Sequence, residues 1–189
     1  MLKYIIPLFL IIYIISIYNS LIIQRNKVKE AFSGIDVQLK KRYDLIPNLV
    51  RTVKQYMEHE KEVLTEVTRL RNKAVNENLS SQEEFNINEL LSQKLVSINM
   101  VVENYPELKA DESFEHLQRS LNEIESQLSA ARRAYNANVR KYNNLIETFP
   151  SRIIANKKGF TKFDYFETDK SENDFKNVKE YFNTWGVDF

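Results

Sequence analysis

Apolar residues follow one another without a charged side chain from Tyr4 to Ile23. A helix needs roughly 20 mostly apolar residues to cross the hydrocarbon core of a bilayer, and this run just reaches that length. A secretory signal would end in small residues ahead of its cleavage site, and residues 16–20 (Ser-Ile-Tyr-Asn-Ser) offer no such site. The pattern therefore predicts an uncleaved single-pass anchor in residues 1–24, with residues 4–23 in the lipid bilayer.

Beyond the anchor, apolar positions recur at steps of three and four, as in a helix that buries one face. Residues 25–74 are accordingly predicted to form a long helix that continues out of the anchor. Pro47 lacks an N–H and its ring crowds the carbonyl of Tyr43, so we expect a kink or short break near Leu45–Ile46. The stripe consists of Val28, Phe32, Ile35, Leu39, Ile46, Leu49, Val53, Tyr56, Val63, Val67 and Leu70.

Two further helices are predicted. Overlapping Ser-x-x-Glu capping boxes that begin at Ser80 start a second helix, which should end before Pro106. Asp111 and Glu112 place acid at the start of a third helix, where the helix dipole favours it. The third helix carries a seam typical of a coiled coil, and its one polar member, Asn138, either fixes the register or reaches the rim. The seam consists of Phe114, Leu117, Leu121, Ile124, Leu128, Ala131, Tyr135, Asn138, Tyr142, Leu145 and Phe149.

These patterns predict an all-α fold in which a transmembrane helix continues into an elongated helical bundle over residues 25–150. Residues 151–189 form an aromatic-rich extension. Within it we expect Ile153–Ile154 and Phe160–Phe166 to pack back across the end of the bundle. We expect Phe175–Phe182 to form a short amphipathic helix.

Composition narrows the functional classes. The 27 basic and 26 acidic residues leave a net charge of +1, so no global field collects nucleic acid. No cysteine is present, which excludes disulfides, thiolate metal sites and thiol nucleophiles. The three glycines form no phosphate-binding loop or dinucleotide fingerprint, and no cofactor is predicted.

Motifs for catalysis are weak. His59 and Glu60 begin a zinc-protease motif, but Val63 stands where the second histidine ligand is required. Carboxylates such as Glu58, Glu62 and Glu66 recur at helical spacing and indicate a solvated helix face. We therefore expect a protein that is not an enzyme and holds no metal.

Some polar residues beside the apolar stripes leave two interpretations open. Asp36 and Asp44 in the first helix either pair with Arg132 and Arg133 across the bundle or are independent surface charges. Two Tyr-Asn pairs, 135–136 and 142–143, lie seven residues apart and so share a helix face. Packing with a satisfied hydroxyl is favoured for them over a ligand pocket.

Several blocks of the sequence resemble the LemA family of bacterial membrane proteins. The most specific block is Asp-Leu-Ile-Pro-Asn-Leu-Val at residues 44–50, and the likeness extends over residues 35–42, 102–110 and 131–136 and to the final Val-Asp-Phe. The chain departs from the family pattern at residues 173–185. The resemblance implies a single anchor, an antiparallel up-and-down bundle and no known enzymatic activity.

The resemblance also implies a role in scaffolding or membrane organisation, because members of the family are associated with membrane proteases, envelope stress and magnetosome formation. We expect a membrane-anchored scaffold or interaction protein of the bacterial envelope. The residues expected to form a structural or interaction motif are Asp36, Gln38, Asp44, Pro47, Asn48, Tyr105 and Arg132.

Two alternatives to a scaffold stay open. The seam of the third helix could pair between chains into a homo-oligomer that organises or bends the bilayer. Alternatively, the tail from Phe160 to Phe189 could reach a membrane protease or envelope partner that the protein regulates as an adaptor. Arg25, Lys27 and Lys29 outnumber the single Lys3 on the other side of the anchor, so the positive-inside rule favours a cytoplasmic bundle in the bacterial cell membrane. Some relatives resemble lipoproteins, which would place the bundle outside.

Overall fold

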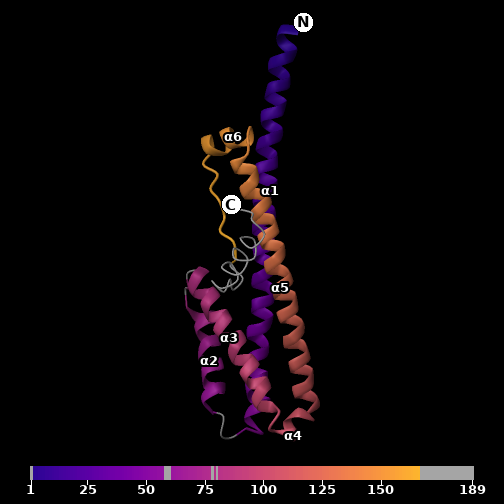
Figure 1. Cartoon of the computed structure of the whole chain (residues 1–189), viewed down its shortest axis with the longest axis vertical. Coiled ribbons are helices and arrows are strands. Elements are labelled where there is room, and N and C mark those ends of the chain that lie inside the picture. The colour runs from indigo at the N-terminus through magenta and orange to yellow at the C-terminus, as the bar shows by residue number, and fades with distance from the viewer. Residues whose placement is uncertain (1, 58–60, 78, 80, 167–189) are drawn as a thin grey trace, which may run out of the picture. The chain divides into compact units, whose positions relative to one another are not determined.

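The computed structural model describes residues 2–57, 61–77, 79 and 81–166. Within these ranges every regular element is a helix, so the predicted all-α class is confirmed (Figure 1). The predicted helix over Phe175–Phe182 lies outside the described residues. The helices are α1 (Leu2–Lys54), α2 (Lys61–Asn76), α3 (Ser81–Val102), α4 (Pro106–Lys109), α5 (Glu112–Glu147) and α6 (Ser151–Lys157).

The chain divides into two compact units that share the two longest helices. Unit 1 combines residues 1–30 with residues 132–189, and unit 2 comprises residues 31–131. The first part of α1 and the last part of α5 belong to unit 1, whereas α2, α3 and α4 belong to unit 2.

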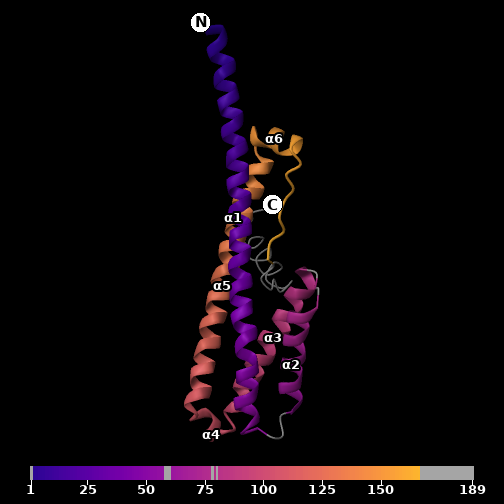
Figure 2. The same ribbon diagram turned by 180° about the vertical axis from the view of Figure 1, so that it is seen from behind.

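Unit 2 is a helical bundle, and the polar contacts between α1 and α5 show in which directions these two helices run. Tyr56 of α1's C-terminal turn hydrogen-bonds Asp111 at 2.9 Å, and Arg42, fourteen residues earlier, lies 3.4 Å from Glu125, fourteen residues later. Partners that advance in opposite directions show that α1 and α5 are antiparallel here. Figures 1 and 2 show α2 and α3 side by side, joined at one end.

The predicted apolar stripes form the cores of both units. In unit 2 the buried side chains include Ile35, Leu39, Ile46, Leu49 and Val53 of α1, Val67 and Leu70 of α2, Leu91, Ile98 and Val102 of α3, and Phe114, Ile124 and Leu128 of α5. In unit 1 they include Leu21, Val28, Tyr135, Val139, Tyr142 and Ile146. The hydrophobic periodicity therefore located most of the core.

The seam of α5 is displaced by one residue near its end. Val139 and Ile146 are buried, whereas the predicted Asn138 and Leu145 are half-buried and Phe149 is 82% exposed. On a straight α-helix, positions seven residues apart are rotated by about 20° around the helix axis. Over five heptads this rotation adds up to about one residue, so the buried positions move from Asn138 and Leu145 to the residues that follow them. Asn138 reaches the rim, where its amide donates to the carbonyl of Ala134 in its own helix.

The first long helix differs from the prediction in two respects. No break occurs near Leu45–Ile46, because α1 continues through Pro47 to Lys54. The helix predicted over residues 25–74 is instead two helices, since the chain turns after Lys54 and α2 begins at Lys61. The apolar spacing did not reveal this turn because buried side chains continue through it, at Val53 and Met57.

Two prolines stand at helix starts. Pro106 is the first residue of α4, and Pro150 immediately precedes α6. A proline fits the first turn of a helix because the N–H it lacks has no intrahelical acceptor there. Periodicity could not find α4 and α6, because they have 4 and 7 residues.

Asp111 caps the N-terminus of α5, in agreement with the predicted acidic start. Its Oδ1 accepts the N–H of Phe114 at 2.9 Å, and its Oδ2 accepts the hydroxyl of Tyr56 at 2.9 Å. The Phe114 N–H, followed by the Tyr56 hydroxyl, holds the pKa of Asp111 below its usual value. A carboxylate at this position satisfies a backbone donor that the helix leaves open.

We predict that Asp111→Ala lowers the thermal midpoint by several degrees at pH 7, because the helix cap is lost. Asp111→Asn should retain most of the stability, since its amide oxygen still accepts the Phe114 N–H. A depressed pKa stabilises the fold above the unfolded-state value of 3.8, and that contribution is lost as the pH falls through the lower folded-state pKa. The difference between wild type and Asp111→Ala should therefore shrink on acidification, and a difference independent of pH would contradict the charged cap.

Candidate functional site

A buried arginine lies at the centre of unit 2. Arg42 occupies a position in the apolar stripe between Leu39 and Ile46, and it is 1% exposed. Its Nη2 donates to Ser92 Oγ at 2.8 Å, and its Nη1 lies 3.4 Å from the carboxylate of Glu125. A charge inside a core is tolerated only when it is paired, so Arg42 ties α1 to both α3 and α5.

The adjacent Tyr43 extends these contacts into a polar belt. Its hydroxyl donates to Asn88 Oδ1 at 2.8 Å, and the Asn88 amide donates to the carbonyl of Glu84 at 2.9 Å. Ser92 donates to the carbonyl of Asn88 at 3.1 Å. We use "polar belt" for Arg42, Tyr43, Arg71, Asn88, Ser92 and Glu125, which come from four helices.

Arg71 completes the polar belt by binding a backbone carbonyl that Pro47 leaves without its intrahelical donor. Pro47 cannot donate to the carbonyl of Tyr43, four residues earlier, as every other residue of a helix interior does. Arg71 Nε of α2 donates to that carbonyl at 3.2 Å. The missing intrahelical hydrogen bond is thus replaced by one between α1 and α2, which explains why α1 continues through a proline.

A pair of carboxylates lies beside the polar belt, on α1 and α3. Asp36 is exposed, but the neighbouring protein atoms partly desolvate its carboxylate and so raise its pKa. Burial, and then the charge of Asp36, raises the pKa of Glu84. The charge of Asp36 therefore disfavours ionisation of Glu84.

The predicted interaction residues are distributed over both units. Asp36, Asp44, Pro47 and Asn48 are exposed on α1, and Gln38 is half-buried with an Oε1 that no donor reaches among the described residues. Tyr105 is half-buried at the N-cap of α4.

Arg132 is also half-buried, but it lies in unit 1. Its pairing with Asp36 or Asp44 stays a prediction.

Asn48 borders an open hollow of unit 2. The hollow measures about 370 Å³, and its lining residues are Asn48, Arg51, Thr52, Ser113, His116 and Leu117. Asp44 lies one helical turn before Asn48 on the exposed face of α1. These side chains combine charge, hydrogen-bonding groups and one apolar residue.

Unit 1 contains a second constellation, in which two asparagines hold a return segment, Phe160–Phe166. Asn143 donates to the carbonyl of Phe163 at 2.9 Å and accepts its N–H at 3.1 Å. Asn136 does the same for Phe166, with both distances 2.9 Å. Phe160–Phe166 packs back as predicted, but it runs along α5 rather than across the end of the bundle. Ile153, which was expected to pack with it, is 61% exposed.

The spacing of the two asparagines matches that of their partners. Seven residues of helix advance about 10.5 Å at 1.5 Å per residue. Three residues of extended chain advance about 10 Å at their maximum reach. Each asparagine side chain can therefore form two backbone hydrogen bonds with a segment that has no neighbouring strand. Gly159, with φ +71°, ends α6 in the left-handed region that favours glycine and precedes the return segment.

Aromatic rings reinforce both attachments. Tyr135 packs against Phe166 with ring centroids 5.0 Å apart, and Tyr142 packs against Phe163 at 5.2 Å. The hydroxyl of Tyr135 donates to the carbonyl of Asp164 at 3.1 Å, so the prediction of a packed ring with a satisfied hydroxyl is confirmed there. Burial raises the pKa of Tyr135, and the charge of Asp164 raises it further.

The described residues do not point to a metal centre. No cluster of three or more His, Asp or Glu side chains among them is arranged to hold a metal ion. His59 and Glu60 lie outside the described residues. His116 is exposed and borders the hollow beside Asn48.

One helix of the described chain, α1, is long and apolar enough to cross a membrane, with a mean hydropathy of 2.3 in its apolar window. This helix and the helical units define the class of membrane-anchored all-helical proteins. The chain belongs to the LemA family, whose family model matches residues 31–181.

Three relatives illustrate the relationship. Protein LemA of Metamycoplasma hominis is 24% identical over 139 residues, which cover 74% of this chain and 64% of that protein. Magnetosome protein MamQ 2 of Paramagnetospirillum magneticum is 34% identical over 67 residues, 35% of this chain and 25% of that protein. Magnetosome protein MamQ of Magnetospirillum gryphiswaldense is 30% identical over 66 residues, again 35% of this chain and 24% of that protein. The chain thus matches less than two thirds of each relative's length.

Sequence reasoning missed the polar belt, although a signal for it existed. Arg42 stands three residues after Leu39 and four before Ile46, which is a position of the buried stripe. A charged residue at such a position requires partners on the neighbouring helices. Asn88, Ser92 and Arg71 carry no comparable signal, because their partners are set by the tertiary packing.

We predict that Arg71→Met destabilises the protein by about 1–3 kcal/mol, because the Tyr43 carbonyl loses its donor. In a Pro47→Ala background the cost should be much smaller, since the substituted residue supplies an N–H to the same carbonyl. Denaturant unfolding of the four proteins gives the coupling energy, and packing lost with Arg71 cancels in this cycle. An equal cost of Arg71→Met in both backgrounds would contradict the replacement of one hydrogen bond by the other.

We also predict that Asn143→Ala releases the return segment at Phe163. Two backbone hydrogen bonds are lost at a side chain that is 6% exposed, each worth about 1–3 kcal/mol when its partner is left unpaired. The amide of Phe163 should then exchange with deuterium roughly tenfold faster or more. Asn144→Ala, at the exposed neighbouring position, is the control, and unchanged exchange in Asn143→Ala would refute the attachment.

Proposed function

We propose that the protein is a membrane-anchored helical module that presents a binding surface for another protein beside the bacterial membrane and catalyses no reaction. The observation that carries the proposal is the burial of the α5 seam within a single chain. Leu128, Val139 and Tyr142 are 0–1% exposed, so these positions are not available to a second chain. A self-sufficient bundle on an apolar anchor suits a module that holds a surface near a bilayer.

The anchor is the apolar part of α1. Every side chain from Tyr4 to Ser16 is exposed, and most are large and hydrophobic. Apolar side chains in such a continuous array are unfavourable in water and favourable in a hydrocarbon core. The membrane-associated character of the LemA family supports the same assignment.

The binding surface that we propose is the exposed face of α1 in unit 2, with Asp36, Asp44 and Asn48. The hollow beside Asn48 gives this face its shape, and Asp36 and Asp44 give it charge. Arg51 and His116 in the lining can pair with carboxylates of a partner. The polar belt lies on the buried side of the same stretch of α1 and holds it in one register.

We propose that the bundle lies in the cytoplasm, because Arg25, Lys27 and Lys29 follow the apolar run and only Lys3 precedes it. The chain has no native cysteine, so Asn48→Cys provides a single thiol. A membrane-impermeant maleimide should label it only after spheroplasts are permeabilised. Labelling of intact spheroplasts would place the bundle outside.

Two alternatives rest on other observations. The likeness to MamQ, a magnetosome protein by name, supports a role in organising a membrane, which a homo-oligomer of this chain would serve. An adaptor for a membrane protease would use the tail, of which Phe160–Phe166 is held by Asn136 and Asn143 and the remainder lies outside the described residues. In the proposed module the exposed face of α1 contacts a different protein, whereas in the homo-oligomer it contacts another copy of this chain.

A photoreactive benzophenone residue at Asn48 should cross-link to a partner in living cells and give one discrete adduct. Asn122, an exposed residue of α5, is the control position. Asp44→Lys should abolish the adduct, because it reverses the charge one turn away on the same face. An adduct at twice the chain mass of 22.4 kDa would favour the homo-oligomer, and a yield at Asn48 no higher than that at Asn122 would contradict the proposed face.

A further inference from the structure

The part of α1 that is free of protein contacts is too short to cross a bilayer by itself. Side chains are exposed from Tyr4 to Ser16, but Ile17 is half-buried and Leu21 is 0% exposed in unit 1. Thirteen residues advance about 20 Å, whereas the hydrocarbon core is about 30 Å thick. Because Lys3 closes the apolar run on the other side, about 10 Å of the membrane must lie against the part of α1 that unit 1 covers.

The segment that covers this part of α1 includes the end of α6. Phe160 packs edge-on against Tyr18 with ring centroids 6.2 Å apart, and Lys158 Nζ lies 6.0 Å from the centre of the same ring. The guanidinium of Arg25 lies over the ring of Phe160, 5.4 Å from its centroid. The level of Tyr18 along α1 is therefore also the level of Lys158 and Phe160.

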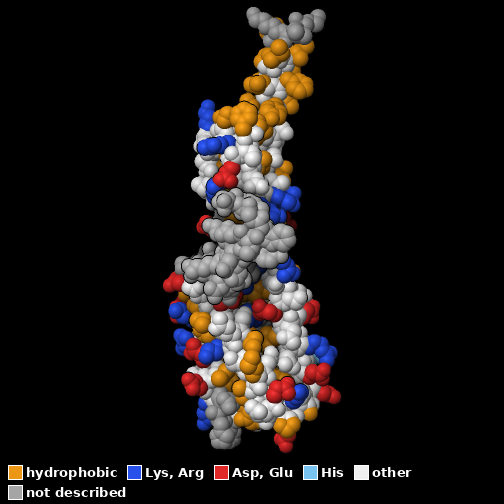
Figure 3. All heavy atoms as spheres, viewed as in Figure 1, with side chains coloured by type: hydrophobic (Ala, Val, Ile, Leu, Met, Phe, Trp, Pro, Cys, Tyr) orange, Lys and Arg blue, Asp and Glu red, His pale blue; other side chains and the backbone are white. Residues whose placement is uncertain are grey.

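The exposed side chains around α6 have the chemistry of a membrane interface. Phe149 is 82% exposed and Ile153 is 61% exposed, while Arg152, Lys157 and Lys158 are exposed beside them. Residues 148–163 contain four basic residues and no acidic one, in a chain whose net charge is only +1. In Figure 3 the hydrophobic surface of the span ends next to Lys and Arg side chains. Apolar side chains bordered by lysine and arginine bind the headgroup region of anionic bilayers.

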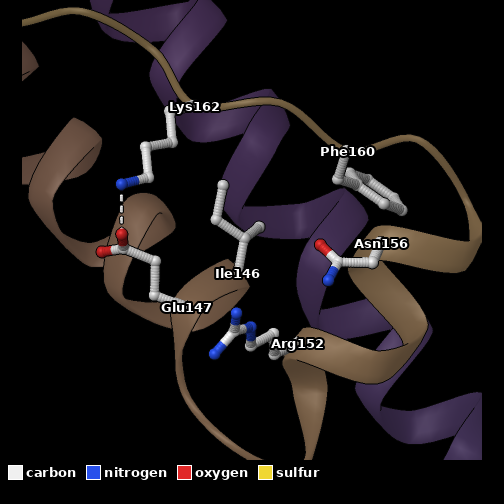
Figure 4. Close-up of a pocket in the computed structure, with 6 residues that line it drawn as sticks. All are labelled: Ile146, Glu147, Arg152, Asn156, Phe160 and Lys162. Atoms are coloured by element: carbon white, nitrogen blue, oxygen red, sulfur yellow. Dashed lines mark ion pairs between the residues drawn. The ribbon is translucent and has the colours of Figure 1, made fainter.

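A hollow opens beside the same surface. It measures about 370 Å³ and is lined by Ile146, Glu147, Arg152, Asn156, Phe160 and Lys162 (Figure 4). Glu147 and Lys162 form an ion pair at one side of it. Arg152 and Asn156 supply further donors, so the lining can accept the phosphate of a lipid headgroup.

We infer that Phe149, Arg152, Ile153, Lys157 and Lys158, together the α6 surface, form a second membrane contact that binds anionic lipid headgroups in the leaflet that α1 enters. The inference rests on the proposed anchoring of α1. The segment that carries the α6 surface contacts α1 at Tyr18, directly after the exposed apolar run, and its charge is complementary to anionic lipid. These features favour the bilayer over a protein as the occupant.

The contact can be tested on the full chain in vesicles, because single cysteines are easily introduced into a chain without any. Ile153→Cys, carrying an environment-sensitive fluorophore, reports on the α6 surface through quenching by lipids with a nitroxide near the headgroup. Ile14→Cys reports on insertion of α1 through deep nitroxides. Ala134→Cys is the matched control, an exposed residue of α5 in the same unit and about 20 Å along the helix from its end at Glu147.

We expect shallow nitroxides to quench the fluorophore at position 153 several-fold more than at position 134, and more in anionic than in zwitterionic vesicles. Lys157→Gln with Lys158→Gln should reduce the preference for anionic lipid, by about fivefold in affinity for each lysine. Deep quenching at position 14 with equal quenching at 153 and 134 would overturn the α6 contact while leaving the anchor intact. Absence of quenching at position 14 would overturn both.

Discussion

An apolar run followed by an apolar stripe extends along most of the 53 residues of α1, and keeping these side chains from water is the constraint on which the rest of the structure depends. Three successive environments along α1 keep these side chains from water. From Tyr4 to Ser16 the helix is bare and suited to lipid. In unit 1 α5, α6 and the return segment cover it, and in unit 2 α2, α3 and α5 bury the stripe from Ile35 to Val53. One helix, α1, passes through all three without a break.

Buried polar groups then select one arrangement of the helices. An apolar stripe tolerates small shifts of register, whereas Arg42, Asn88 and the Tyr43 carbonyl each need a particular partner. Pro47 has a constructive role here, because the hydrogen bond that it removes from α1 becomes a contact with Arg71 of α2. In unit 1 the asparagines at positions 136 and 143 act similarly, since they hold an extended segment for which no strand is available. Specificity in both units therefore comes from few polar contacts in a largely apolar interior.

The sequence predicted the fold class, the anchor and most buried positions, because these depend on hydrophobic periodicity that is local to each helix. It did not predict the turn after Lys54, where buried residues continue through the change of direction, or the one-residue drift from Asn138 to Val139. The partners of Arg42 and of the Tyr43 carbonyl could not be predicted, since they join residues 28 to 83 positions apart. The spacing of Asn136 and Asn143 was visible, but their partners in the return segment appear only when the chain has folded back.

We propose that one chain buries its own seams and acts as a single anchored module. The absolute mass of the full-length protein in mild detergent, measured by light scattering with the detergent contribution subtracted, distinguishes this module from an assembly of several chains. We expect one chain of 22.4 kDa per particle. A discrete oligomer of several chains would contradict the claim and would make the assembly itself the functional form of the protein.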